Sequence, residues 1–340
     1  MLAASAAAMH PATTAAQHRR AILMLLVANA FWGLSFPTVK AMTLQYEELL
    51  PGAGAWYTVN LTIAPRFLLA TAILLLWQLR RVATITRGEI AQGGVMGLFA
   101  AAGMLLQTDG LRFTAASTSA FLTQFYAILI PVYVALRSRR NPGARVWIAS
   151  GLVLVGVAIL GRFDFNAFGF GRGEWETLLS SLFFMGQILW LEKREYAANR
   201  AGMVTLALCA TLALIFGAGT LATAPDAGAL VGPWTSGPWV GFTLILTLFC
   251  TLGAFSLMTA WQPKMTATEA GLIYCLEPIF GSVFALCLPA LFSAWALIAY
   301  ANETANWNLL IGGGLITLAN VYIQLRPSPR LEQAEAQAKL

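Results

Sequence analysis

The chain has 340 residues, of which 58% are hydrophobic and only 11% are charged. A soluble domain carries about 25% charged residues because its surface faces water, so this composition excludes a water-soluble enzyme or binding module. The formal net charge of +6 does not indicate nucleic-acid binding, because the basic residues lie in short clusters between long apolar runs. The composition predicts a membrane protein without a nucleic-acid partner.

Ten apolar runs are close to the length of about 17–25 residues that crosses a bilayer. In chain order they are Ala21–Lys40, Val59–Leu79, Ile90–Asp109, Ala115–Leu136, Val146–Leu160, Glu174–Leu191, Ala201–Ala222, Pro238–Gln262, Ala267–Leu288 and Trp307–Leu325. We therefore expect an all-α membrane protein with ten transmembrane helices. Residues 1–20 are expected to form a disordered N-terminal tail, and residues 326–340 a cytoplasmic C-terminal tail.

Lysine and arginine residues gather in every second loop between these runs, which places those loops in the cytoplasm by the positive-inside rule. With an even number of spans, both termini lie on that side, and the chain is expected to be a multi-pass protein of the inner membrane. The basic loops contain Arg19, Arg20, Arg80, Arg81, Arg87, Arg137, Arg139, Arg140, Arg145, Lys193, Arg194, Arg200, Lys264, Arg326, Arg330 and Lys339.

The cysteines and histidines do not form a metal-binding pattern. All four cysteines lie inside apolar runs and are interpreted as small packed hydrophobes, and both histidines, His10 and His18, lie in the N-terminal tail. The spans contain no histidine and no HExxH or GxSxG motif, which argues against an intramembrane enzyme. We expect no metal, no cofactor and no enzymatic activity.

An internal repeat relates the two halves of the chain. Ala120 precedes Pro131 by the same distance as Ala267 precedes Pro278, in the fourth and ninth runs. Similar matches pair the first run with the sixth and the fifth with the tenth, through Gly33 and Lys40, Gly186 and Lys193, Gly151-Leu152, and Gly314-Leu315. Because each half has five spans, the second half (174–325) enters the membrane from the opposite side to the first (21–162). This inverted architecture is typical of secondary transporters with a site near the membrane centre.

Several short motifs resemble the EamA type of the drug/metabolite transporter superfamily between about Ala21 and Leu325. They are Phe31-Trp32-Gly33-Leu34-Ser35-Phe36 with Lys40, Arg66-Phe67, Thr118-Ser119-Ala120 with Pro131, Leu276-Glu277-Pro278, and Ile311-Gly312-Gly313-Gly314-Leu315-Ile316. The resemblance implies a ten-helix carrier of small organic solutes that is facilitative or driven by a proton or other gradient.

The chain departs from the family pattern at two places. Arg137-Ser138-Arg139-Arg140 stand where the family often has a Gly-Glu pair at the end of the fourth helix. The acid that matches this pair in the second half is Glu303, but the additional residues Cys287–Asn302 separate it from Pro278. The ninth helix is therefore expected to be extended or broken.

Glu277 is the clearest candidate for a functional residue, because an ionisable side chain in hydrocarbon costs at least about 2.5–3.5 kcal/mol. Burial favours the protonated carboxyl group, so Glu277 is expected either to exchange a proton or to satisfy carbonyl groups freed by Pro278. Arg66 and Lys40 are expected near the exterior mouth, where they could attract an anion. The alternatives are that Lys40 reaches the lipid headgroups and that Arg66 pairs with Glu47 or Glu48.

Helical spacing completes the candidate site. The predicted substrate-binding residues are Trp32, Ser35, Phe36, Arg66, Gln124, Tyr126, Gln187, Trp190, Tyr274, Glu277 and Asn320, and the predicted gating or coupling residues are Lys40, Glu277, Pro131 and Pro278. For the tryptophans, packing or an interfacial position is the default alternative.

The favoured function is secondary transport of a small organic metabolite, either amino-acid-like or amphipathic, by alternating access and with export as the direction. The expected partners are this solute and the lipid bilayer, and the expected state is a monomer or weak homodimer. The alternatives are an intramembrane enzyme, a non-transporting sensor or scaffold, and a channel.

Overall fold

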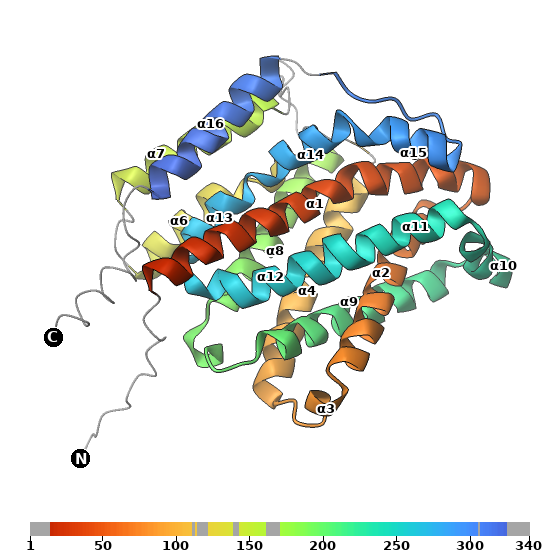
Figure 1. The fold of residues 1–340 in the computed structure, drawn as a ribbon, viewed down its shortest axis with the longest axis horizontal. Helices are drawn as coiled ribbons and strands as arrows, with labels where there is room; N and C mark the ends of the chain where they lie inside the picture. The colour runs from red at the N-terminus through yellow and green to blue at the C-terminus, as the bar shows by residue number, and fades with distance from the viewer. Residues whose placement is uncertain are drawn as a thin grey trace.

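A computed structural model describes residues 14–110, 113, 122–138, 143–160, 171–304 and 307–324, and within these ranges the chain is helical, with no strand (Figure 1). Of the expected tails, residues 1–13 and 326–340 lie outside the described residues, whereas residues 15–20, expected to be disordered, are helical. Five of the described helices are long and apolar enough to cross a membrane, or six if one bent helix pair counts as a single span. The chain is therefore an all-α, multi-pass membrane protein.

The first helix, α1 (Ala15–Leu49), is longer at both ends than the expected span, so the predicted boundaries at residues 21 and 40 are wrong. It begins early because Thr14 and Gln17 form a capping box. It continues beyond Lys40 because Met42 and Tyr46 are buried against other helices. Its 35 residues span about 52 Å at 1.5 Å per residue, and hydrocarbon accounts for about 30 Å of that length.

The remaining described helices of the first half largely match the expected spans. They are α2 (Ala55–Trp77), the short α3 (Leu79–Val82), α4 (Arg87–Gly110), α6 (Tyr126–Ser138) and α7 (Ala144–Leu160). The fourth expected span, Ala115–Leu136, falls partly outside the described residues, and its described part consists of residues 122–125 and α6.

The second half contains more helical segments than expected. They are α8 (Arg172–Leu191), η1 (Arg194–Tyr196), α9 (Ala201–Thr223), α10 (Ala227–Val231), η2 (Gly232–Thr235), α11 (Gly237–Ile245), the π-helical η3 (Leu246–Gly253), α12 (Ala254–Trp261), η4 (Gln262–Lys264), α13 (Ala267–Tyr274), α14 (Glu277–Ala285), α15 (Leu288–Ala296) and α16 (Trp307–Gln324). Segments α11 to η4 together form the eighth span. The ninth span is broken between α13 and α14, and α15 follows at an angle of 56°.

Glycine residues allow close helix packing in the bilayer core. A Cβ atom on Gly97 of α4 would lie 2.6 Å from the Thr211 Cβ atom of α9. A Cβ atom on Gly103 would lie 2.7 Å from the Phe184 ring of α8, and one on Gly186 of α8 would lie 2.6 Å from the Phe99 ring of α4. Each helix of the α4–α8 pair thus inserts a phenylalanine at a glycine of the other. At one edge of the molecule, α7 and α16 pack side by side (Figure 1).

The additional segment after the ninth span folds as α15 and packs on α11 at the end of the molecule opposite the basic loops. We call this the far end. The Phe242 ring of α11 contacts the rings of Phe292 and Trp295, each at a centroid distance of 5.0 Å. These rings belong to a second apolar cluster, which also contains Tyr46 of α1 and Tyr57 of α2. The segment is therefore a packed cover of the far end.

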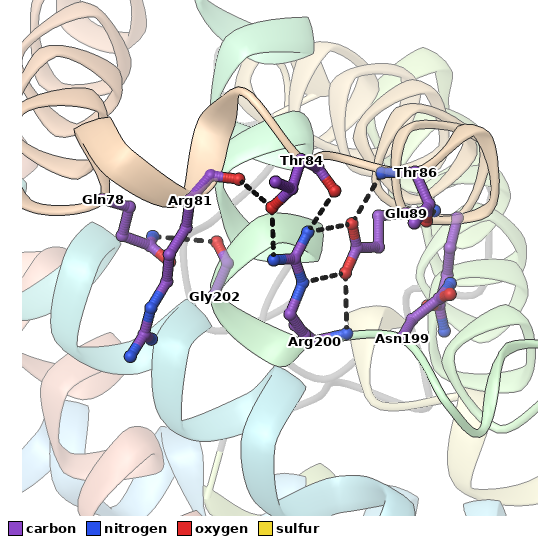
Figure 2. Close-up of polar contacts among 9 residues, drawn as sticks. Gln78, Arg81, Thr84, Thr86, Glu89, Asn199, Arg200 and Gly202 are labelled. Atoms are coloured by element: carbon purple, nitrogen blue, oxygen red, sulfur yellow. Dashed lines mark hydrogen bonds and ion pairs between the residues drawn. The ribbon is translucent and has the colours of Figure 1, made fainter.

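At the opposite, basic end, a hydrogen-bond network joins the two halves of the chain (Figure 2). The Arg200 guanidinium donates to both Glu89 carboxylate oxygens, at 2.7 and 2.9 Å, and also to the Thr84 carbonyl oxygen at 2.8 Å. Beside it, Asn199 Nδ2 donates to Gln92 Oε1 at 2.9 Å. The loop before α4 is thereby fixed to the start of α9. The same contact with Glu89 raises the pKa of Arg200, so the ion pair persists at any physiological pH.

Candidate functional site

The break between α13 and α14 follows from Pro278. Proline has no amide hydrogen, so the carbonyl group of Tyr274, four residues earlier, lacks its usual helical donor. The chain tightens there, with Cys275 and Leu276 amides bonding to carbonyls only three residues back at 3.2 and 3.0 Å. Glu277 begins α14 at this break and is only partly buried. Its carboxyl group has no hydrogen bond or ion pair to any described residue, and it therefore does not serve as a bonding partner for the broken helix.

Helix α1 packs against this break through glycine. A Cβ atom on Gly33 would lie 2.6 Å from the Phe280 Cβ atom, and one on Gly281 would lie 2.9 Å from the Phe36 ring. Pro37 lies inside α1 and leaves the Gly33 carbonyl group without its usual helical donor. Helices α1 and α14 thus pack closely at Gly33 and Gly281, and each contains a proline near this contact.

Arg66 lies in the middle of α2, and its predicted position near the exterior mouth is wrong. It follows Ala55 by eleven residues, about 16 Å along the axis, because α2 begins earlier than expected. The side chain is 9% exposed, its Nε atom has no partner, and its other described polar contact is with Met104 Sδ at 3.5 Å. Neither Glu47 nor Glu48 pairs with it. A charge buried in this way costs several kcal/mol unless it finds a counter-ion.

A chain of aromatic contacts connects Arg66 with the helix break. The Arg66 guanidinium lies 5.0 Å from the Phe67 ring, and Phe67 contacts Phe255 of α12 at 5.9 Å. Trp32 of α1 contacts Phe255 at 5.7 Å and Tyr274 at 5.4 Å. We call Trp32, Phe67, Phe255 and Tyr274 the aromatic wall.

The Cys250 side chain of η3 is also buried, and η3 packs against both α1 and α2, the helices that carry Trp32 and Arg66. The site thus combines an arginine and a glutamate, neither of which has an ion-pair partner among the described residues, with an apolar wall. Such a mixture suits a small organic solute with polar ends.

Pro131 of α6 has a different environment from Pro278. The carbonyl group that it frees, that of Ala127, accepts a hydrogen bond from Ser150 Oγ of α7 at 3.0 Å. Near the start of α6, Gln124 and Tyr126 are buried, and Gln124 Oε1 has no partner. Helix α6 packs against α13, which places it next to the helix break.

Other predicted residues do not all join this site. Trp190 lies at the basic end, where Lys193 Nζ is 3.3 Å from its ring centroid, which is the interfacial alternative considered for the tryptophans. Ser35 Oγ donates to the Trp32 carbonyl oxygen at 2.6 Å within α1. Gln187 is buried and its Nε2 atom has no partner. The Asn320 side chain lies outside the described residues.

Lys40 is exposed at the far end, 6.0 Å from the ring centroid of Tyr300 in the cover. Burial, together with the nearby Glu303 charge, raises the pKa of Tyr300 to about 12. The phenol is therefore neutral at physiological pH, and Lys40 contacts an uncharged ring.

Sequence reasoning missed Gln262, Phe255 and Cys250. Tyr274 Oη donates to Gln262 Oε1 at 2.9 Å, and Gln262 Nε2 donates to the Ile188 carbonyl oxygen at 2.8 Å. Through Gln262, these bonds link the last residue of α13 to α8. Gln262 is an uncharged polar residue at the end of a span, so it gave no signal beyond that of an ordinary loop residue. Among the described residues, no three His, Cys, Asp or Glu side chains are grouped as metal ligands.

Comparisons with known proteins agree with this architecture. Residues 19–162 match the model of the EamA-like transporter family. An "Uncharacterized transporter" from Archaeoglobus fulgidus is 25% identical over 311 residues, covering 89% of this chain and 85% of the relative. A protein crystal structure with 16% sequence identity has a TM-score of 0.67, covering 91% of this chain and 97% of the other. This last similarity concerns the fold alone.

Proposed function

We propose that this chain, whose residues 19–162 match the model of the EamA-like transporter family, is a secondary transporter that moves a small organic metabolite across the inner membrane. The solute is amino-acid-like or amphipathic, the mechanism is alternating access, and the direction is export. Two five-helix halves of opposite topology, residues 21–162 and 174–325, carry this activity.

The pattern of helix contacts supports two related halves. A pseudo-two-fold axis lets corresponding spans that lie next to the axis pack on each other, as α2 does with α9 and α7 with α16. A contact between two spans that do not correspond should also be found between their two counterparts. The packing of α4 on α8, the third span on the sixth, has its counterpart in the packing of η3 and α12 on α1, the eighth span on the first. The packing of α14 on α1 has its counterpart in that of α6 on α8.

The observation that carries the proposal is Glu277, which has no polar partner within the described part of the chain and lies at a helix break that packs on α1. Broken helices at the membrane centre are characteristic of transporter sites, because unwound backbone is tolerated only around a cavity or within protein. The aromatic wall reaches this break through Tyr274, and Arg66 lies at the other end of the wall beside Phe67. Rocking of α1 against α14 at Gly33 and Gly281 would open the site to one side of the membrane at a time.

The experiment is a thermal-shift panel of metabolites on purified protein, followed by proteoliposome flux of each stabilising solute. We expect at least one solute to raise the melting temperature and to cross liposomes that contain the protein faster than empty liposomes. If no solute crosses, with or without a pH gradient, the transporter proposal fails.

A further inference from the structure

We propose that Arg66 is the receptor for a carboxylate group on the transported solute, so that the substrates are small organic monocarboxylates with an apolar body. This inference rests on the proposed function and specifies its substrate class. It starts from the guanidinium group itself, which is nine-tenths buried and has no acidic partner among the described residues. The solute carboxylate would supply the counter-ion that the fold lacks.

A lipid headgroup cannot take this role. Arg66 lies at the centre of α2, about 16 Å from the helix start at Ala55, which is farther than an arginine side chain extends. The guanidinium instead contacts Met104 Sδ and lies beside the Phe67 ring. Its ligand must therefore enter the protein interior.

The surroundings of Arg66 favour a carboxylate over a phosphate. A guanidinium binds either group through two parallel hydrogen bonds. However, a phosphate dianion would bring a second charge, and no second cationic side chain is paired with Arg66 among the described contacts. A single guanidinium neutralises a single carboxylate.

The aromatic wall indicates that the part of the solute beyond its carboxylate is apolar. It begins at Phe67, next to Arg66, and continues through Phe255 and Trp32 to Tyr274. Phe67, Phe255 and Tyr274 are almost fully buried in this structure, so a solute whose carboxylate binds Arg66 would have its body among these rings once the helices move apart to admit it.

The test uses matched pairs of carboxylic acids and their carboxamides, which differ in charge but hardly in shape. Suitable pairs are 4-methylpentanoate with 4-methylpentanamide, phenylacetate with phenylacetamide, and L-leucine with L-leucinamide. Dissociation constants are measured by calorimetry on the purified full chain. We expect at least one acid to bind, and its amide to bind at least 10-fold more weakly.

Two variants assign the effect to Arg66. Arg66→Met should abolish acid binding while leaving the melting temperature of the ligand-free protein unchanged or higher, because an unpaired buried charge is removed. Arg66→Lys should bind acids with intermediate affinity, because the charge remains but the paired donors are lost. The control is Arg194→Met, which removes an exposed arginine and should bind as the wild type does.

The inference is overturned if no acid of the panel binds, if amides bind as tightly as acids, or if Arg66→Met binds acids with wild-type affinity. Proteoliposome flux of a neutral or cationic solute would overturn the carboxylate assignment but still support the transporter proposal. Acid binding without flux would leave the Arg66 site intact and contradict transport. Inorganic phosphate and anionic lipid vesicles serve as competitors, and displacement of the acid by either at equal concentration would also contradict the assignment.

Discussion

Gly33 of α1 and Gly281 of α14 lie against each other, and each accommodates a phenylalanine of the opposing helix. A Cβ atom on Gly33 would also lie 2.8 Å from the Gly281 backbone nitrogen atom, so even a methyl group would force the helices apart. The α4–α8 pair repeats this exchange through Gly103 and Gly186. The α1–α14 contact differs because both of its helices contain a proline at this level.

Replacement of Gly33 by alanine should destabilise the protein by about 1–3 kcal/mol, because a well-packed interface cannot absorb an added methyl group. The thermal-unfolding midpoint in detergent measures this effect. The control is Gly217→Ala in α9, where a Cβ atom would meet nothing within 4 Å. Alanine there should leave stability unchanged or improve it by about 0.5–1 kcal/mol. Equal midpoints for the two variants would show that the close approach of α1 and α14 is incorrect.

The Ser150 hydroxyl should stabilise the folded protein only because Pro131 leaves the Ala127 carbonyl group without a helical donor. Ser150→Ala should cost about 1 kcal/mol of unfolding free energy, because a buried acceptor loses its donor. In a Pro131→Ala background, the new amide hydrogen can bond to Ala127, and the same change should cost much less. A double-mutant cycle measures this coupling, with Ser180→Ala as control, because that hydroxyl bonds only within its own helix. Strictly additive effects would refute the link.

The network at the basic end should stabilise the contact between the two halves. Arg200→Lys removes the paired donors that hold Glu89 and Thr84 and should lower the unfolding midpoint and increase proteolysis in the loop 83–86. Arg194→Lys, in the exposed part of the 192–200 loop, is the matched control and should behave as the wild type does. If Arg200→Lys is as stable and as protease-resistant as the control, the network contributes nothing to the contact.

The orientation in the membrane can be tested with single cysteines at the two ends. Glu48 is exposed near the end of α1, and Arg194 is exposed at the basic end. In intact cells, a membrane-impermeant maleimide should label Glu48→Cys, and it should label Arg194→Cys only after permeabilisation. Both variants carry Cys287→Ser, which removes the exposed native thiol. The opposite labelling pattern would contradict the cytoplasmic location of the basic end.

The sequence predicted helix positions well where hydropathy alone decides them, as for α4, α7 and α9. It failed at α1, where the helix continues beyond Lys40 because Met42 and Tyr46 find apolar partners in distant segments. The additional residues Cys287–Asn302 predict that the ninth helix is extended or broken, and a 56° bend does precede α15. The break between α13 and α14 lies earlier, at Pro278, because a proline removes a backbone donor whatever its tertiary surroundings. The burial of Arg66 was not predictable, since it depends on where α2 begins and on which residues of other helices face it.

The central claim is carrier-type transport of a small organic solute, and counterflow in proteoliposomes tests it most directly. Vesicles are loaded with an excess of the best-stabilising unlabelled solute and then diluted into a trace of labelled solute. An alternating-access carrier should accumulate label transiently above equilibrium, because outward movement of unlabelled solute returns the site to face the outside. Entry that approaches equilibrium without an overshoot would indicate a channel, and entry no faster than into empty liposomes would contradict transport altogether.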